Sequence, residues 1–291
     1  MMTVRGAMRR ATQVEEVNFL LTNRIPRRLA TRFAGWFSRI ELAPVRALSM
    51  AIWRLLCDVD LSDARKPRFT SLHDCFVREL EEGARPPDRD PLLLASPCDA
   101  IVGACGAIEG DRLYQVKGLA YALGDLLGDE AHAEIYRDGI YATLRLTAGM
   151  YHHFHAPHDL RVEAVRYIYG DVWNVNPVAL KRVERLFCRN ERAAIRARLD
   201  QGGAPITLVA VAAILVAGIR LPFLGEASLR GSTRTIAADA AFAKGERIGW
   251  FEHGSTIILF APKGFALRHG IETGRRIQAG EALFRLPRSP A

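Results

Sequence analysis

Hydrophobic and polar positions along the chain change their spacing near residue 91. In residues 1–56, apolar side chains recur at helical spacing among arginines, which predicts helices that are broken by Pro26 and Pro44. A further helical pattern covers residues 71–82. Beyond residue 91, short apolar runs are separated by glycine-containing turns, which is typical of β-strands. We therefore predict an α+β fold, in which N-terminal amphipathic helices precede a mostly antiparallel β body with a few short helices.

Two apolar runs in the β part stand out. The longest covers residues 206–219; it is too short to cross a bilayer as a helix and is rich in Val and Ile, so we predict a buried strand. The second, residues 257–260, is β-branched and aromatic and predicts another buried strand. The other predicted strands are 101–108, 113–116 (which pairs back on it), 140–146 and 162–169, and short helices are predicted at 123–127 and 180–186.

Positive charge is concentrated near the N-terminus. The whole chain carries a net charge of +8, and residues 1–57, with ten arginines and three glutamates, carry +7 of it. Arginines interleaved with aromatic and aliphatic residues suit a helix that lies in the interface of an anionic membrane. We predict that residues 1–57 form a basic, membrane-associating helical segment and that residues 58–291 form the main domain. The alternative is an amphipathic helix packed on that domain with a solvated arginine face.

Composition narrows the other possibilities. Five cysteines, an odd number without C-x-x-C spacing, argue against a disulfide framework and against a zinc site made of thiolates. The basic first ten residues lack a following apolar stretch, so we predict no signal peptide. We expect no nucleic-acid partner, because no recognition-helix or base-stacking motif follows the basic segment.

Four of the eight histidines lie within seven residues: His152, His153, His155 and His158. Two kinds of chemistry fit such a cluster. A zinc hydrolase would use two of them, with a third ligand elsewhere. Acid–base chemistry would need one histidine, a carboxylate that fixes its tautomer, and a nucleophile. We expect His153 and His158 to be surface residues.

Asp99 and the pair Gly254–Ser255 supply the groups that acid–base chemistry would need. Asp99 follows Pro97 in an apolar neighbourhood, although a turn-forming aspartate is the ordinary interpretation. Gly254 has no Cβ, so its carbonyl group can be approached closely, and Ser255 carries a hydroxyl that attacks once a base removes its proton. From spacing alone, an Asp/His/Ser relay, a zinc site and an ordinary turn before a strand all stay open.

Six stretches, in order along the chain, resemble motifs of one enzyme family. They are Ser96-Pro97-Cys98-Asp99-Ala100 (S-P-x-D-G in the family), Gln115-Val116-Lys117-Gly118 (Q-[IV]-K-G), Tyr151-His152-His153-Phe154-His155-Ala156-Pro157 (Y-H-R-[VF]-H-x-P), residues 169–177, residues 186–192, and residues 244–256 with the final H-G-S-T (most often L-G-S-T). The chain thus resembles the bacterial, membrane-associated, pyruvoyl-dependent phosphatidylserine decarboxylases over most of its length.

The resemblance implies a self-processing enzyme. Asp99 would orient His155, which takes the proton of the Ser255 hydroxyl. The Ser255 oxygen then attacks the carbonyl of Gly254, and the chain is cut between residues 254 and 255 into a large and a small chain. Ser255 would become a covalent pyruvoyl group, the only cofactor implied, which forms a Schiff base with the substrate amine. Phosphatidylserine would lose CO2 to give phosphatidylethanolamine, with His152 assisting decarboxylation or proton transfer. No metal is implied.

The chain departs from the family pattern at a few positions. Ala100 stands where glycine is usual, and His253 stands where leucine is most frequent, immediately before the cut. A second Gly-Ser-Thr occurs at residues 231–233, but it lacks the K-G-x-x-x-G-x-F stretch that leads into the first. We therefore expect processing at Ser255.

The resemblance also implies a peripheral enzyme on the cytoplasmic side of the cell membrane, a homodimer, and a substrate held in an anionic bilayer. Three alternatives remain: a zinc-dependent hydrolase that uses the His152–His158 cluster, a lipid-binding relative without catalysis, and a pyruvoyl decarboxylase of a soluble amino acid.

Overall fold

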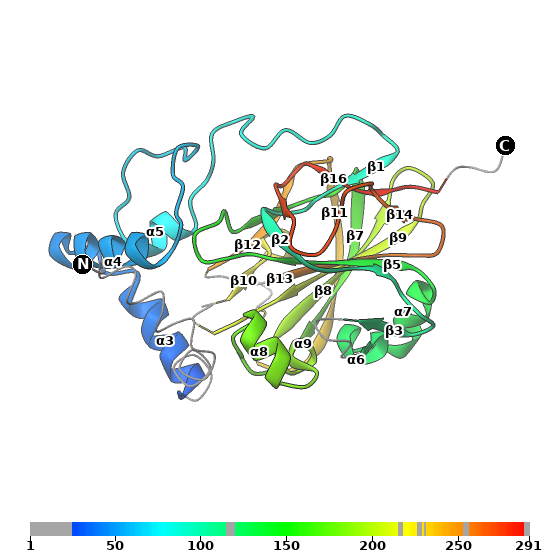
Figure 1. The fold of residues 1–291 in the computed structure, drawn as a ribbon, viewed down its shortest axis with the longest axis horizontal. Helices are drawn as coiled ribbons and strands as arrows, with labels where there is room; N and C mark the ends of the chain where they lie inside the picture. Colours follow the sequence, from blue (N-terminus) through cyan, green and yellow to red (C-terminus); the bar gives the residue numbers. More distant parts are fainter. Residues whose placement is uncertain are drawn as a thin grey trace.

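The computed structural model describes residues 25–114, 120–214, 218–225, 229, 231–252 and 256–287, and Figure 1 shows their arrangement. Helices occupy the N-terminal side and antiparallel sheets most of the rest, so the predicted α+β fold is confirmed. Residues 1–24 of the predicted helical segment lie outside the described residues, as do Gln115–Gly118 of the second motif and the pair Gly254–Ser255.

The main sheet has eight strands in the order β11-β7-β8-β9-β13-β5-β2-β15, and every neighbouring pair is antiparallel. The strands are β2 (Ala100–Ala107), β5 (Ile140–Arg145), β7 (Leu160–Ile168), β8 (Arg192–Leu199), β9 (Pro205–Val211), β11 (Arg234–Phe242), β13 (Thr256–Ala261) and β15 (Arg276–Ile277). All six residues of β13 are buried, because β9 and β5 flank it, which confirms the strand predicted at residues 257–260. β11 alternates exposed and half-buried residues, as an edge strand does.

Smaller sheets complete the β body. One has the order β10-β12-β6, another β1-β16-β14, and β3 pairs with β4. Their strands are β6 (His153–His155), β10 (Ile219–Arg220), β12 (Arg247–Phe251), β1 (Leu93–Ala95), β14 (Ala266–Leu267), β16 (Ala282–Arg285), β3 (Arg112–Tyr114) and β4 (Ala120–Ala122). The short helices are α6 (Leu123–Leu127), α7 (Glu130–Ala133), α8 (Pro177–Arg182) and α9 (Leu186–Arg189), with 3-10 turns at Glu134–Tyr136 and Pro222–Leu224.

Two longer helices and one short one lie on the N-terminal side: α3 (Arg27–Phe37), α4 (Ala43–Leu56) and α5 (Leu72–Phe76). Pro26 caps α3 and Pro44 lies in the first turn of α4, so both prolines begin a helix, where a missing N–H costs nothing. No helix in the described part of the chain has the length and apolarity that crossing a bilayer requires.

Two arginines of helix α3 bind the helix to the β body. Arg27 forms an ion pair with Asp171 and stacks its guanidinium 3.7 Å from the ring centre of Trp173. Arg28 donates to the carbonyl oxygen of Gly170 at 2.7 Å. Eight large apolar side chains of the helical region are exposed. They are Leu29, Phe33 and Trp36 on α3, Leu42 between the helices, and Leu48, Ile52, Leu55 and Leu56 on α4.

Three predicted elements are wrong in extent. The helix predicted at 71–82 is only α5, because Leu80 bridges to Ala64 in an extended conformation. The run 206–219 is not one strand: β9 ends at Val211 and β10 joins a different sheet. The predicted helix 180–186 is replaced by α8 and α9, because Val183 is extended between them.

The strand predicted at 113–116 also differs. It was expected to pair with 101–108, whereas β3 pairs with β4. The short helix predicted at 123–127 is confirmed as α6.

Candidate active site

The histidine motif lies beside the strand that leads toward Gly254 and Ser255. β6 pairs antiparallel with β12, so that His155 is opposite Arg247 and His153 is opposite Trp250. Only glycine fits at position 249 between them. A Cβ there would lie 2.3 Å from the carbonyl oxygen of Arg220 and 2.8 Å from the Phe154 ring. This close packing fixes the backbone path that runs toward the predicted cut.

His155 is held by two hydrogen bonds that define its tautomer. Its Nδ1 lies 2.9 Å from the carbonyl oxygen of Gly245, and its Nε2 lies 3.1 Å from the hydroxyl of Tyr151. A carbonyl can only accept, so Nδ1 carries the hydrogen and the lone pair of Nε2 accepts the hydrogen of the Tyr151 hydroxyl. Burial lowers the pKa of His155, while the Gly245 carbonyl and the charge of Asp99 act to raise it. The neutral ring is therefore suited to act as a base through Nε2.

Asp99 has a different direct partner from the one predicted. Its carboxylate accepts hydrogen bonds from Arg85 Nε at 2.8 Å and Arg85 Nη2 at 2.7 Å, and from the backbone amide of Ala279 at 2.9 Å. No hydrogen bond joins it to His155 among the residues that the structure describes. The two are nevertheless neighbours, because the His155 amide donates to the carbonyl oxygen of Pro97 at 2.8 Å. Asp99 thus acts on His155 through its charge.

His152 is buried, and its ring centre lies 4.0 Å from that of Phe76 in α5. Its carbonyl oxygen accepts from the amide of Phe251, the last residue of β12. His152 therefore lies next to the end of the strand that leads to the predicted cut, in an environment from which water is excluded.

The expectation that His153 and His158 are surface residues is wrong, since both are buried. The Nε2 of His153 bonds to the carbonyl oxygen of Val77 at 3.0 Å, and burial lowers the pKa of His153 to about 4. The Nε2 of His158 bonds to the carbonyl oxygen of Pro91 at 2.9 Å. Nowhere in the described part of the chain do three or more His, Cys, Asp or Glu side chains converge as metal ligands, so the geometry gives the zinc alternative no support.

The predicted cut is flanked by two well-defined residues. Thr256 begins β13, where it is buried opposite both Arg145 and Val211. Glu252 follows β12 and is also buried. His253, Gly254 and Ser255 between them lie outside the described residues.

Glu252 binds two arginines and a histidine from distant parts of the chain. Its Oε1 lies 2.8 Å from Arg39 Nη2, 3.1 Å from Arg220 Nη2 and 3.5 Å from His73 Nε2. Burial acts to raise the pKa of Glu252, but the hydrogen bond from His73 and the charges of the two arginines outweigh it and lower the pKa to about 2. Glu252, two residues before Gly254, is therefore anchored as a carboxylate. Neither Glu252 nor its partners were predicted as site residues, because no local pattern marks them.

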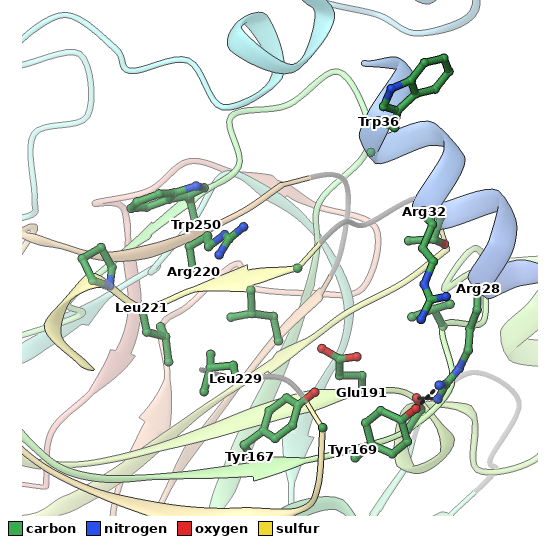
Figure 2. Close-up of a pocket in the computed structure, with 18 of the residues that line it drawn as sticks. Arg28, Arg32, Trp36, Tyr167, Tyr169, Glu191, Arg220, Leu221, Leu229 and Trp250 are labelled. Atoms are coloured by element: carbon green, nitrogen blue, oxygen red, sulfur yellow. Dashed lines mark hydrogen bonds between the residues drawn. The ribbon is translucent and has the colours of Figure 1, made fainter. Parts of the chain in front are cut away.

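A cavity of about 1190 Å³ opens between α3 and the β body, as Figure 2 shows. Arg39 and Arg220, which bind Glu252, also line this cavity. Figure 2 shows Arg28 and Arg32 of α3 across the cavity from Arg220. The cavity is therefore lined in part by the two arginines that bind Glu252, which lies shortly before the predicted cut.

Comparison with known proteins agrees with this arrangement. The family model described as phosphatidylserine decarboxylase matches residues 72–285. The phosphatidylserine decarboxylase proenzyme of Marinobacter nauticus is 33% identical over 280 residues, which cover 92% of this chain and 97% of the relative. That of Pasteurella multocida is 32% identical over 270 residues, which cover 89% and 91%. That of Xanthomonas axonopodis pv. citri is 34% identical over 236 residues, which cover 78% and 84%.

Proposed function

Because the chain belongs to the phosphatidylserine decarboxylase family, we propose that it is a precursor that cuts itself between Gly254 and Ser255 and then converts phosphatidylserine to phosphatidylethanolamine and CO2. The observation that carries the proposal is the pairing of β6 with β12, which sets the histidine motif beside the strand leading to these residues. The relatives are named proenzymes, which fits a chain that needs processing.

The proposed cut begins at His155. Once the Tyr151 hydroxyl has released its hydrogen bond to Nε2, this nitrogen takes the proton of the Ser255 hydroxyl, while Nδ1–H stays bonded to the Gly245 carbonyl. The negative charge of Asp99 stabilises the protonated ring. The Ser255 oxygen bonds to the carbonyl carbon of Gly254 and the C–N bond breaks, so the peptide becomes an ester. Elimination then removes the Cα proton of residue 255 and frees the Gly254 carboxylate, which leaves a dehydroalanine. Water adds to the imine form of this residue and ammonia departs, so that a pyruvoyl group remains at residue 255.

The residues around position 255 fit such a group. Thr256 is fixed between two neighbouring strands, and its buried hydroxyl has no hydrogen-bond partner within the described part of the chain. A carbonyl on the preceding residue can use this donor. When present, a pyruvoyl group supplies a ketone that accepts the electrons of the bond that breaks.

His152 is the residue that we propose for proton transfer to the substrate. It is buried beside Phe76 and next to the end of β12. An environment without water favours loss of CO2, since the charge of the substrate carboxylate disappears in that step. His152 then donates a proton to the substrate carbon that had carried the carboxylate.

We further propose that the protein is a peripheral enzyme on the cytoplasmic side of the membrane and works as a homodimer. The exposed apolar surface of α3 and α4 supports membrane association, since eight large side chains there are open to solvent. The basic residues of 1–57 would add attraction to anionic lipids.

The deciding experiment is an intact mass of the purified protein under denaturing conditions, with Ser255→Ala as the control. We expect two chains from the wild type, the smaller equal to residues 255–291 less one ammonia, and one chain from the variant. The processed protein should then release CO2 from phosphatidylserine vesicles. A single wild-type chain would refute self-processing: bound zinc in equal amount would favour the hydrolase, and vesicle binding without zinc would favour the lipid-binding relative.

A further inference from the structure

The cavity between α3 and the β body carries an excess of positive charge. Among its described lining residues four are arginines, at positions 28, 32, 39 and 220, and one is acidic, Glu191. Arginine guanidinium groups suit phosphate oxygens, because their planar fork donates several hydrogen bonds at once. The charge and the donor type together indicate an anionic ligand that carries phosphate.

Three of the four arginines already have partners. Arg28 donates to Tyr169 and to the carbonyl oxygen of Gly170, and Arg39 and Arg220 share the carboxylate of Glu252. Arg32 differs from them, since it is exposed and forms neither an ion pair nor a hydrogen bond with any residue that the structure describes. Figure 2 shows its guanidinium group pointing into the cavity.

The surroundings of the cavity indicate that the phosphate belongs to a lipid. Trp36 lines the cavity and is itself exposed, and it continues into the exposed apolar surface formed with Leu29 and Phe33. A ligand with an anionic head and apolar tails would match both surfaces. On the other side, the lining includes Trp250 in β12, the strand that leads to Ser255.

We propose that this cavity binds the phosphodiester of the phospholipid substrate, with Arg32 as a direct ligand of the phosphate and the acyl chains lying over α3. The assignment rests on the proposed function and names the headgroup site for it. Arg39 and Arg220 line the same cavity, with their charges shared with the carboxylate of Glu252.

The test compares Arg32→Gln with Arg54→Gln in the processed protein. Arg54 is an exposed arginine of α4 that does not line the cavity, so both changes remove one charge from the same helical region. The kinetic probe is dihexanoyl phosphatidylserine below its aggregation concentration. We expect Arg32→Gln to raise KM about 10- to 100-fold with little change in kcat, as for loss of one charge-assisted hydrogen bond. Arg54→Gln should leave KM unchanged.

A binding measurement makes the test independent of catalysis. Dihexanoyl phosphatidylglycerol has the phosphodiester but no amine, and quenching of the cavity tryptophans Trp36 and Trp250 reports its binding. We expect Arg32→Gln, but not Arg54→Gln, to lose affinity for phosphatidylglycerol by about the factor by which its KM rises. Inorganic phosphate should bind to the wild type much more weakly than the lipid. Because Arg32 has no partner among the described residues, the Arg32→Gln variant should cut itself normally. If it does not, the comparison of phosphatidylglycerol binding still tests the role of Arg32.

The outcomes separate this inference from the proposed function. Equal effects of the two variants, or none from Arg32→Gln in an active enzyme, would overturn the headgroup site and leave the decarboxylase intact. Inorganic phosphate that binds as tightly as the lipid would overturn the lipid assignment. A processed protein that is inert toward phosphatidylserine, yet binds phosphatidylglycerol through Arg32, would overturn the proposed reaction and keep the phosphodiester site.

Discussion

Replacing Glu252 by glutamine should destabilise the protein by a predictable amount. The carboxylate is buried, with 5% of its side chain exposed, and it binds Arg39, Arg220 and His73. Glutamine keeps the shape but removes the charge. The two arginines are 45% and 42% exposed, so water can solvate them once their partner is neutral. The cost therefore comes mainly from the lost carboxylate interactions.

The pKa of Glu252 sets the magnitude. Its fall from the ordinary value of 4.5 to about 2 corresponds to a contribution of about 3 kcal/mol to the free energy of unfolding at pH 7. Because the pKa is lower in the folded state, this contribution is complete above about pH 4.5 and disappears as the pH falls through about 2. At pH 3 the difference between wild type and Glu252→Gln should be less than half of its value at pH 7.

The assay is urea unfolding followed by tryptophan fluorescence, in a Ser255→Ala background so that the chain stays in one piece. Glu163→Gln is the matched control, because Glu163 pairs with Arg198 at 2.9 Å on the surface, where an ion pair contributes less than about 1 kcal/mol. Equal losses in the two variants would refute the reasoning. So would a Glu252→Gln deficit that is the same at pH 3 as at pH 7.

Three further predictions concern processing and the membrane. Self-cleavage should proceed at a constant rate as the pH falls from 8, and the rate should drop to half only below pH 6.5, because burial lowers the pKa of His155 and the neutral ring is the base. The rate is measured by gel electrophoresis after a pH jump. A midpoint above pH 6.5 would contradict this. Asp99→Asn should slow cleavage about tenfold or more, since the charge that stabilises protonated His155 is lost; unchanged cleavage would remove Asp99 from the mechanism. Phe33→Gln, on the exposed surface of α3, should weaken sedimentation with anionic vesicles at unchanged thermal stability; undiminished binding would argue against this surface.

Strands and motifs were predictable where the signal is local. The burial of β13 follows from its continuous apolar sequence, and α6 follows from its own periodicity. The short α5 was not predictable, because the chain after it is drawn into a bridge between Ala64 and Leu80 that no local pattern announces.

The site was predictable only in part for the same reason. The motif resemblance pointed to Asp99 and His155, but the direct partner of Asp99 is Arg85, from a loop before the β body. The partners of Glu252 come from three separate segments of the chain. Long-range ion pairs of this kind arise from tertiary packing, so a single sequence without its fold does not reveal them.

The position of β13 in the main sheet bears on how the protein must be made. Residues 256–287 supply β13 between β9 and β5, and also β14, β15 and β16. The proposed cut before Ser255 would therefore leave the two pieces interleaved, and neither could separate without dismantling the sheet. Two separate chains would have to associate in a concentration-dependent step before β13 could insert between β9 and β5. In one continuous precursor that insertion is intramolecular. Synthesis as a single chain thus lets the protein assemble once, and heat or denaturant would then inactivate the matured form irreversibly.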